Sequence, residues 1–284
     1  MTAIHRGWHQ ALEGLVAGAR ESLTIAAPFI TASGASSIAA KLDPVLRNSG
    51  RIDVITDLSP GHVCDGALEP AAIQSLMGAT PFASLWHVPR FHAKIYIADG
   101  SRAIVTSGNL TAGALYRNVE YGFDVCDKEL VATIDTDLAE VRFLGVAISA
   151  EQLAEYVDVA IRVRESYRKQ QTTVDPALKQ AFAKAIQSAE EDLIRFRLAG
   201  GAMHTVFAKT IVHLLRKHGP LRTEAIHRLV QSLHPDLCDD SVDRVIGPKR
   251  YGKKWKHAVR TAQQQDKRLG LIENEGDLWR ATGV

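Results

Sequence analysis

The segment FHAKIYIADGSRAIVTSGNLT, residues 91–111, constrains the fold more than any other part of the chain. Apolar residues at positions 91, 93, 95 and 97 alternate with His92, Lys94 and Tyr96, the period-two pattern of a β-strand with one buried face. A second apolar run, RAIVTS, follows a turn that Asp99 begins. The segment therefore predicts two neighbouring strands, with Tyr96 packed in the core and His92 and Lys94 projecting together.

The rest of the first half alternates strands with helices. Apolar, β-rich runs predict further strands at 23–30, 51–59, 82–89 and 120–127, and amphipathic or capped stretches predict helices at 8–20, 33–50 and 70–80. This order indicates an α/β sandwich with a mixed sheet. A helical region follows from about 128 to 198, with Ser149 and Gln152 spaced as a capping box and a polar linker at 170–176.

The last 80 residues are expected to form a separate module. Helices are predicted near 204–219 and 222–235, a third short one capped by Asp239 or Asp240, and a basic helix up to Gly270. LIENEGDLWRAT predicts a terminal hairpin. Several helices, one of them basic, and a hairpin describe a winged-helix-like module. The predicted domains are thus 1–150, a helical connector at 151–200, and 201–284.

Charge is distributed unevenly along the chain. The net charge is only +2, yet the block 244–268 holds nine cations and one acid, Asp266. Such a block is explained either by a solvated face or by a nucleic-acid site. On the second explanation the DNA-binding residues are Lys249, Arg250, Lys253, Lys254, Lys256 and Arg260. Trp255 and Trp279 are expected to pack in the module's core.

The cysteines and the hydropathy pattern bear on the compartment. The three cysteines show no CxxC spacing, so neither a zinc ribbon nor a disulfide framework is expected, and a cytoplasmic location is favoured. We expect no signal peptide at the N-terminus. The sequence contains no run of about 18 uncharged apolar residues, so we expect no membrane span.

Pairing of the two strands in residues 91–111 would bring four polar side chains to one edge of the sheet. These are His92, Lys94, Ser107 and Asn109. A lysine neutralises phosphate oxygens, and hydroxyl and amide groups hydrogen-bond to them. A neutral imidazole can attack phosphorus or relay a proton. The cluster therefore suits a phosphodiester substrate.

The same stretch resembles the HxK…GSxN signature, or HKD motif, of the phospholipase D superfamily. His92, Lys94 and Asp99 stand at the spacing HxKxxxxD, and Ser107 and Asn109 match the SxN half. The resemblance covers roughly residues 20–145. Thr106 departs from the pattern, because the family usually has glycine there.

In RNVEYG, Glu120 matches the acid that supports the histidine in many members of the superfamily. The resemblance thus implies six catalytic residues: His92, Lys94, Asp99, Ser107, Asn109 and Glu120. The carboxylate of Asp99 is equally explained as stabilising the turn that it begins. Asn118 and Arg117 are further candidates for phosphate contacts.

The superfamily mechanism needs two histidines and neither a metal nor another cofactor. One histidine forms a phosphohistidine, and the second protonates the leaving oxygen and then activates water. Among the eleven histidines only His92 is followed by lysine two positions on. The resemblance therefore implies a homodimer in which two copies of His92 meet at a two-fold axis.

The basic C-terminal module favours DNA as the substrate. Its combination with a phospholipase-D-like domain is similar to metal-independent restriction endonucleases and defence nucleases, and further restriction or defence subunits are conceivable partners. Two alternatives stay open. The chain could be a catalytically weak or inactive DNA-binding subunit, which Thr106 favours, or a phospholipid hydrolase or transferase, for which it lacks a membrane-binding amphipathic helix.

Overall fold

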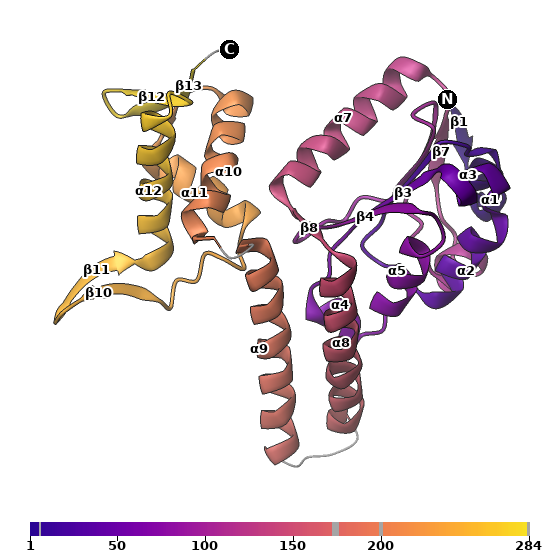
Figure 1. The fold of residues 1–284 in the computed structure, drawn as a ribbon, viewed down its shortest axis with the longest axis horizontal. Helices are drawn as coiled ribbons and strands as arrows, with labels where there is room; N and C mark the ends of the chain where they lie inside the picture. Colours follow the sequence, from indigo (N-terminus) through magenta and orange to yellow (C-terminus); the bar gives the residue numbers. More distant parts are fainter. Residues whose placement is uncertain (6, 172–175, 199–200, 283–284) are drawn as a thin grey trace. The chain divides into compact units, whose positions relative to one another are not determined.

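The computed structural model describes residues 1–5, 7–171, 176–198 and 201–282 (Figure 1). The chain forms two compact units, Met1–Leu193 and Ile194–Val284. The linker predicted at 170–176 falls mainly on 172–175, which lie outside the described residues.

An eight-stranded mixed sheet forms the centre of the first unit. Its strand order is β1-β7-β6-β5-β2-β3-β4-β8. β2, β3 and β4 run parallel, and the other neighbours are antiparallel. The strands are β1 (Thr2–Ile4), β2 (Ser22–Ala26), β3 (Arg51–Thr56), β4 (Phe82–His87), β5 (Ile95–Ala98), β6 (Arg102–Thr106), β7 (Gly122–Val125) and β8 (Val146–Ile148). The predicted mixed α/β sheet is confirmed.

Helices cover both faces of this sheet. On one face α1 packs on β5 and β6, and α5 packs on β3 and β4. Trp8 of α1 lies 5.9 Å from Tyr96 between ring centroids, and the Tyr96 hydroxyl donates to the Gly108 carbonyl, so the predicted packing of Tyr96 is confirmed. The helices that precede β7 in the chain are α1 (Trp8–Gly18), α2 (Ala32–Lys41), α3 (Pro44–Ser49), α4 (Pro60–Cys64), α5 (Pro70–Met77) and α6 (Ala112–Tyr116).

The opposite face is covered by α7 (Lys128–Leu144). Val131 and Leu138 of α7 are buried against Ile97, Ala103 and Val125 of the central strands. Figure 1 shows α7 on the other side of the sheet from α1, α2 and α5. Because both faces are covered, β5 and β6 are buried on both sides, which explains why Tyr96 and Ile97 are both inaccessible.

Two long helices follow β8, namely α8 (Ala150–Gln171) and α9 (Pro176–Leu198). The capping box is confirmed, since Ser149 N donates to Gln152 Oε1 over 2.9 Å and Gln152 N donates to Ser149 Oγ. α8 packs on α4 and α5, and its Tyr156 hydroxyl donates to the Leu58 carbonyl. The region predicted as a connector therefore begins with a helix that belongs to the first unit.

The second unit contains three helices and a three-stranded antiparallel sheet among its described residues. Its elements are α10 (Met203–His218), β9 (Leu221–Arg222), α11 (Thr223–Leu233), β10 (Asp243–Ile246), β11 (Lys249–Lys253), α12 (Lys254–Arg268), β12 (Ile272–Glu275) and β13 (Leu278–Ala281). The sheet has the order β12-β13-β9. This order of helices, short strand and terminal hairpin is compatible with the predicted winged helix.

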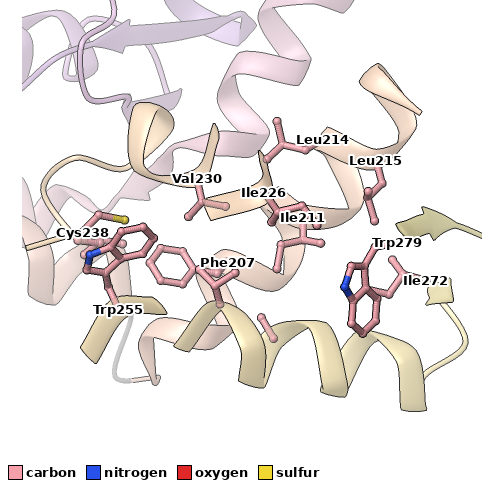
Figure 2. Packing of buried hydrophobic residues seen from close by; sticks show 13 residues of the cluster. Phe207, Ile211, Leu214, Leu215, Ile226, Val230, Cys238, Trp255, Ile272 and Trp279 are labelled. Carbon is pink, nitrogen blue, oxygen red and sulfur yellow. The ribbon is translucent and has the colours of Figure 1, made fainter. Parts of the chain in front are cut away.

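Both tryptophans of the second unit lie in its core, as predicted. Figure 2 shows Trp255 beside Phe207, and Trp279 close to Ile272. Each indole nitrogen has a partner, because Trp255 Nε1 donates to Asp240 Oδ1 over 2.9 Å and Trp279 Nε1 donates to a threonine hydroxyl. These rings hold the helices and the hairpin together rather than facing solvent.

The third short helix predicted after Asp239 or Asp240 is wrong. Asp240 accepts the Trp255 indole instead of capping a helix, and the chain continues into the antiparallel pair β10–β11. Gly247 and Pro248 form the two-residue turn, and Gly247 has a φ of 58°. Glycine at the first central position fits a hairpin turn, and proline blocks a helix there.

The buried acid of the basic helix allows a prediction on stability. Asp266 is 2% exposed, its Oδ2 has no hydrogen-bond partner among the residues that the structure describes, and burial raises the pKa of its carboxyl to about 6. The folded state therefore binds a proton more tightly than the unfolded state, so this group costs stability as pH rises from about 4 through 6. Asp266→Asn should raise the free energy of unfolding by about 1–3 kcal/mol at pH 8.

The gain from Asp266→Asn should shrink towards zero near pH 3, below the carboxyl pKa of both the unfolded and the folded state, where the aspartate is largely protonated in both. Urea unfolding of both proteins at the two pH values measures it. A gain that is equal at both values would contradict a charged, unpartnered carboxylate at this position.

No single helix among the described residues is long and apolar enough to cross a membrane. The pair Lys179–Leu198 and Met203–His218 reaches the necessary length and apolarity only when both segments are taken together.

Candidate active site

The pairing of β5 with β6 brings the two halves of the predicted motif together. Ile95 is opposite Val105, and Thr106 N donates to the Lys94 carbonyl over 3.0 Å, one step beyond the strand. Lys94 and Ser107 therefore leave the sheet at the same end. The strand begins at Ile95, later than predicted, because the preceding segment turns at Arg90, whose φ is 62°. His92 thus lies in the segment 91–94, which precedes the strand.

His92 and Lys94 are in direct contact. Lys94 Nζ lies 3.1 Å from His92 Nδ1 and donates to the His92 carbonyl over 3.0 Å. The His92 side chain is exposed, whereas Lys94 is buried. Burial lowers the pKa of the Lys94 ammonium, and the nearby Glu120 carboxylate opposes that shift. The lysine is therefore a partly desolvated cation beside an accessible imidazole, which strengthens its attraction for an anion.

Glu120 connects to the serine of the motif. Ser107 Oγ donates to Glu120 Oε2 over 2.5 Å, and Asn118 Nδ2 donates to Glu120 Oε1 over 3.2 Å. Tyr121 N donates to Ser107 Oγ over 3.1 Å, so the serine hydroxyl accepts one hydrogen bond and donates another. Glu120 is buried, and its charge acts on Lys94. Asn118, considered as a phosphate contact, supports the acid instead.

Asn109 borders an open cavity of about 560 Å³. Its Oδ1 is buried and has no hydrogen-bond partner among the described residues, so it is available to a donor from a ligand. Phe29 and Arg117 also line the cavity. Phe29 presents itself edge to face to His92 at 6.2 Å between ring centroids, which places the cavity next to the His92–Lys94 pair.

Thr106, where the superfamily usually has glycine, turns its side chain into the sheet. Its Oγ1 donates to the Tyr121 carbonyl over 3.2 Å and accepts from Gly108 N over 3.1 Å. The facing residue of β7 is Gly122, where an added Cβ would lie 2.7 Å from Thr106 Cβ. A glycine opposite thus makes room for the threonine. The Cβ of Thr106, which a glycine would lack, fills the space that Gly122 leaves in the sheet.

Asp99 does not join the cluster. It stands at the other end of β5, with a φ of 51°, and its carboxylate accepts hydrogen bonds from the backbone amides that lead into β2. The distances are 2.9 Å from Arg20 N and 2.8 Å from both Glu21 N and Ser22 N. Three backbone donors on one carboxylate make a strong structural link between β2 and the β5–β6 turn. This geometry favours the structural explanation of Asp99.

Asp99→Asn tests that role. Asparagine tolerates the positive φ but removes the charge from the amide cluster, so we expect a loss of about 1–3 kcal/mol in the free energy of unfolding. Any catalytic rate of the folded protein should stay within about twofold of the parent, since the side chain is remote from His92. A large loss of rate with unchanged stability would return Asp99 to the catalytic group.

Phe29, whose ring lies against His92, was not predicted from the sequence, and neither was His62, whose ring lies against Phe29. Phe29 follows β2, and His62 in α4 lies 5.0 Å from the Phe29 ring. His62 Nε2 is 3.5 Å from Asp57 Oδ2. Both are about 30 or more positions from His92 in the chain, and no local pattern signals their approach. The place of Phe29 follows from β2 and β5 being neighbours in the sheet.

The six predicted DNA-binding residues lie in β11 and α12 of the second unit. Lys249 and Arg250 are exposed on β11, and Lys254 and Arg260 are exposed on α12. Lys253 Nζ forms an ion pair with Asp243 at 2.9 Å, and Lys256 Nζ lies 5.4 Å from the Trp255 ring. Four of the six side chains are thus exposed to solvent, whereas those of Lys253 and Lys256 are partly buried.

The family comparison applies to the first unit. Residues 12–142 match the family described as "Cardiolipin synthase, PLD-like domain". The first unit contains a phospholipase-D-like domain. The match spans the motif from His92 to Glu120 and the central strands β2 to β7. No curated protein sequence matches the chain.

Several solved structures resemble the chain at low sequence identity. Nuc from Salmonella typhimurium, a phospholipase D family member, is 16% identical, with a TM-score of 0.41 over 51% of this chain and 95% of that one. NucT from Helicobacter pylori is 16% identical, with a TM-score of 0.37 over 49% and 93%. A phosphatidylserine synthase from Haemophilus influenzae Rd KW20 is 15% identical, with a TM-score of 0.43 over 57% and 41%.

Potential metal ligands are scattered in the part of the chain that the structure describes. No group of three or more histidine, cysteine, aspartate or glutamate side chains is arranged there to hold an ion.

Proposed function

We propose that the chain is a metal-independent phosphodiesterase that cleaves DNA through a phosphohistidine, with its active site shared between two copies of the chain. The contact between Lys94 Nζ and His92 Nδ1 carries this proposal. It sets a nucleophile and a cation side by side where Ser107, Glu120 and Asn109 also converge. A phosphate bound to the lysine would lie within reach of the imidazole.

The covalent step follows from these positions. A ring nitrogen of His92 attacks phosphorus, a P–N bond forms, and the P–O bond to the departing nucleoside breaks. Lys94 compensates the charge on the non-bridging oxygens, and Asn109 supplies a polar contact. Glu120 holds Ser107 in place through the 2.5 Å hydrogen bond.

Departure of the nucleoside oxygen requires a proton from a second group. We assign that role to His92 of a second copy, because no other histidine of this chain is followed by lysine two positions on. The same imidazole then takes a proton from water, which attacks the phosphohistidine, breaks the P–N bond and regenerates His92. Acid and base are thus one group used twice.

DNA is proposed as the substrate because of the second unit. Its exposed cations on β11 and α12 would bind successive phosphates of a duplex. A requirement for further restriction or defence subunits and a cytoplasmic location remain predictions.

A nuclease assay in EDTA tests the proposal. Cleavage of supercoiled plasmid should be unchanged by chelation, and quenching a reaction on 5′-³²P-labelled or internally labelled duplex with detergent at alkaline pH should trap labelled protein that is stable to alkali and labile to acid. Cleavage that needs added Mg²⁺, or labelled protein with the opposite stability, would contradict the mechanism.

The same assay separates the alternative functions. Tight duplex binding with no cleavage and no trapped phosphoprotein would identify a DNA-binding subunit that keeps the fold without catalysis. Hydrolysis of phosphatidylglycerol vesicles in place of DNA would identify a lipid enzyme. Parallel reactions on duplex DNA, single-stranded DNA and RNA define the nucleic acid.

A further inference from the structure

A two-stranded hairpin, β10–β11, is inserted between α11 and α12 of the second unit. Its strands pair only with each other in the described part of the chain. The side chains from Arg244 to Gly252 are all exposed. Figure 1 shows the hairpin projecting past the N-terminal end of α12. An isolated two-stranded hairpin is at best marginally stable in water, so this one is expected to gain stability from a partner.

The base of the hairpin is attached to α12. Lys254 N donates to the Val242 carbonyl over 2.9 Å, and Lys253 Nζ pairs with Asp243 at 2.9 Å. His257 Nε2 forms a hydrogen bond of 2.5 Å with the Tyr251 carbonyl. These contacts fix the direction in which the hairpin leaves the helix.

The tip combines apolar side chains with a tight turn. Ile246 pairs with Lys249 around the turn Gly247–Pro248. Val245 is 57% exposed and Ile246 is 53% exposed, and as neighbours in a strand they point to opposite faces. Both faces of the tip therefore present aliphatic surface to water, which is unfavourable unless a partner covers it.

Cations surround this apolar tip. The twelve residues 243–254 hold five cations and one acid, Asp243. The cations are Arg244, Lys249, Arg250, Lys253 and Lys254. A polyanion satisfies such a charge, and a duplex also offers the stacked base pairs between which an aliphatic wedge can enter. Charge and apolarity together thus match one occupant, double-stranded DNA.

We propose that β10–β11 is a DNA-bending arm: the tip at Val245, Ile246 and Pro248 wedges between base pairs from the minor groove while the flanking cations bind phosphates on either side. Isoleucine and proline serve as such wedges in minor-groove proteins, where they kink the duplex by roughly 20–90°. The proposal rests on DNA being the substrate, and it adds a deformation that plain phosphate binding does not require.

Energy transfer between dyes at the two ends of a duplex of about 30 bp measures the bend, since this length is far below the persistence length of DNA. The full chain carrying His92→Ala is used at saturation, so that the duplex stays intact. We expect a rise in transfer with this protein. The double change Val245→Ser/Ile246→Ser should abolish the rise while binding weakens by less than about tenfold.

Variants of the charges should behave in the opposite way. Lys249→Ala/Arg250→Ala should weaken binding more than about tenfold and lower the slope of log affinity against log salt by about 2, yet leave the bend at saturation unchanged. Leu269→Ser is the matched control, because Leu269 is 63% exposed and lies outside the hairpin. It should change neither the bend nor the affinity.

Each outcome bears on the arm separately from the nuclease. A serine variant that bends DNA as the parent does would overturn the wedge, as would binding of the hairpin to phosphatidylglycerol vesicles in preference to the duplex. DNA bending by a parent chain that never cleaves would uphold the arm and overturn the proposed nuclease. Cleavage of DNA by a parent chain that does not bend it would overturn the arm and uphold the proposed nuclease.

Discussion

His92→Ala is expected to lower the cleavage rate at least about 10³-fold, because the variant loses the nucleophile and, in a symmetric dimer, the proton donor as well. The fold should be unaffected, since the His92 side chain is exposed and lies outside the strand. Initial rates on supercoiled plasmid at saturating protein measure the effect. His218→Ala is the control, because His218 is exposed at the end of α10, in the second unit.

Mixed dimers make this prediction sharper. When parent and His92→Ala chains are unfolded together in equal amounts and refolded, random pairing gives about one quarter parent dimers and one half mixed dimers. A site that needs both copies of His92 leaves about one quarter of the parent activity, whereas independent sites leave about one half. Activity near one half would refute the shared site while leaving the role of His92 intact.

The core of the site could be predicted from the sequence because it depends on local rules. The period of two in residues 91–98 and the run 102–106 predicted the pair β5–β6, and antiparallel pairing necessarily joins the start of one strand to the end of the next. Lys94 and Ser107 therefore had to meet. The mixed sheet with helices on both faces followed from the alternation of strands and helices in the same way.

Residues that reach the site through the topology of the sheet were not predictable. Phe29 is next to His92 only because β2 pairs with β5, a contact that no short pattern encodes. Asp99 illustrates the converse, since it fits the spacing of the motif but its partners are backbone amides at Arg20, Glu21 and Ser22. The spacing of residues in a motif does not reveal at which end of the sheet each side chain makes its contacts.

The hairpin β10–β11 was missed for a local reason. Its cations belong to one continuous basic block, whose charge masks two strand signals, the β-branched pair Val245–Ile246 and the Gly247–Pro248 turn that follows it. Composition located the positive charge correctly, whereas only the order of residues within the block separates an exposed hairpin from the helix that follows it.

Trp255→Ala is expected to have the largest effect on stability. Trp255 is 1% exposed, packs in the core of the second unit and donates its indole proton to Asp240. Deleting a buried tryptophan side chain costs about 3–5 kcal/mol, which is a large share of the stability of a unit of this size. The second unit should then be largely unfolded at 37 °C, while the first unit, which has its own core, keeps its fold.

Two measurements on Trp255→Ala separate these consequences. In calorimetry, the unfolding transition of the second unit should disappear or move down by about 10 °C or more, and that of the first unit should stay in place. A loss of about 1 kcal/mol shifts the midpoint of a small domain by about 4–8 °C. DNA affinity should fall because folded β11 and α12 present the cations. Trp255→Phe keeps most of the packing and loses the hydrogen bond to Asp240, so about 1–2 kcal/mol is expected. Equal losses for the two variants would mean that the hydrogen bond, rather than the buried ring, holds α12 in place.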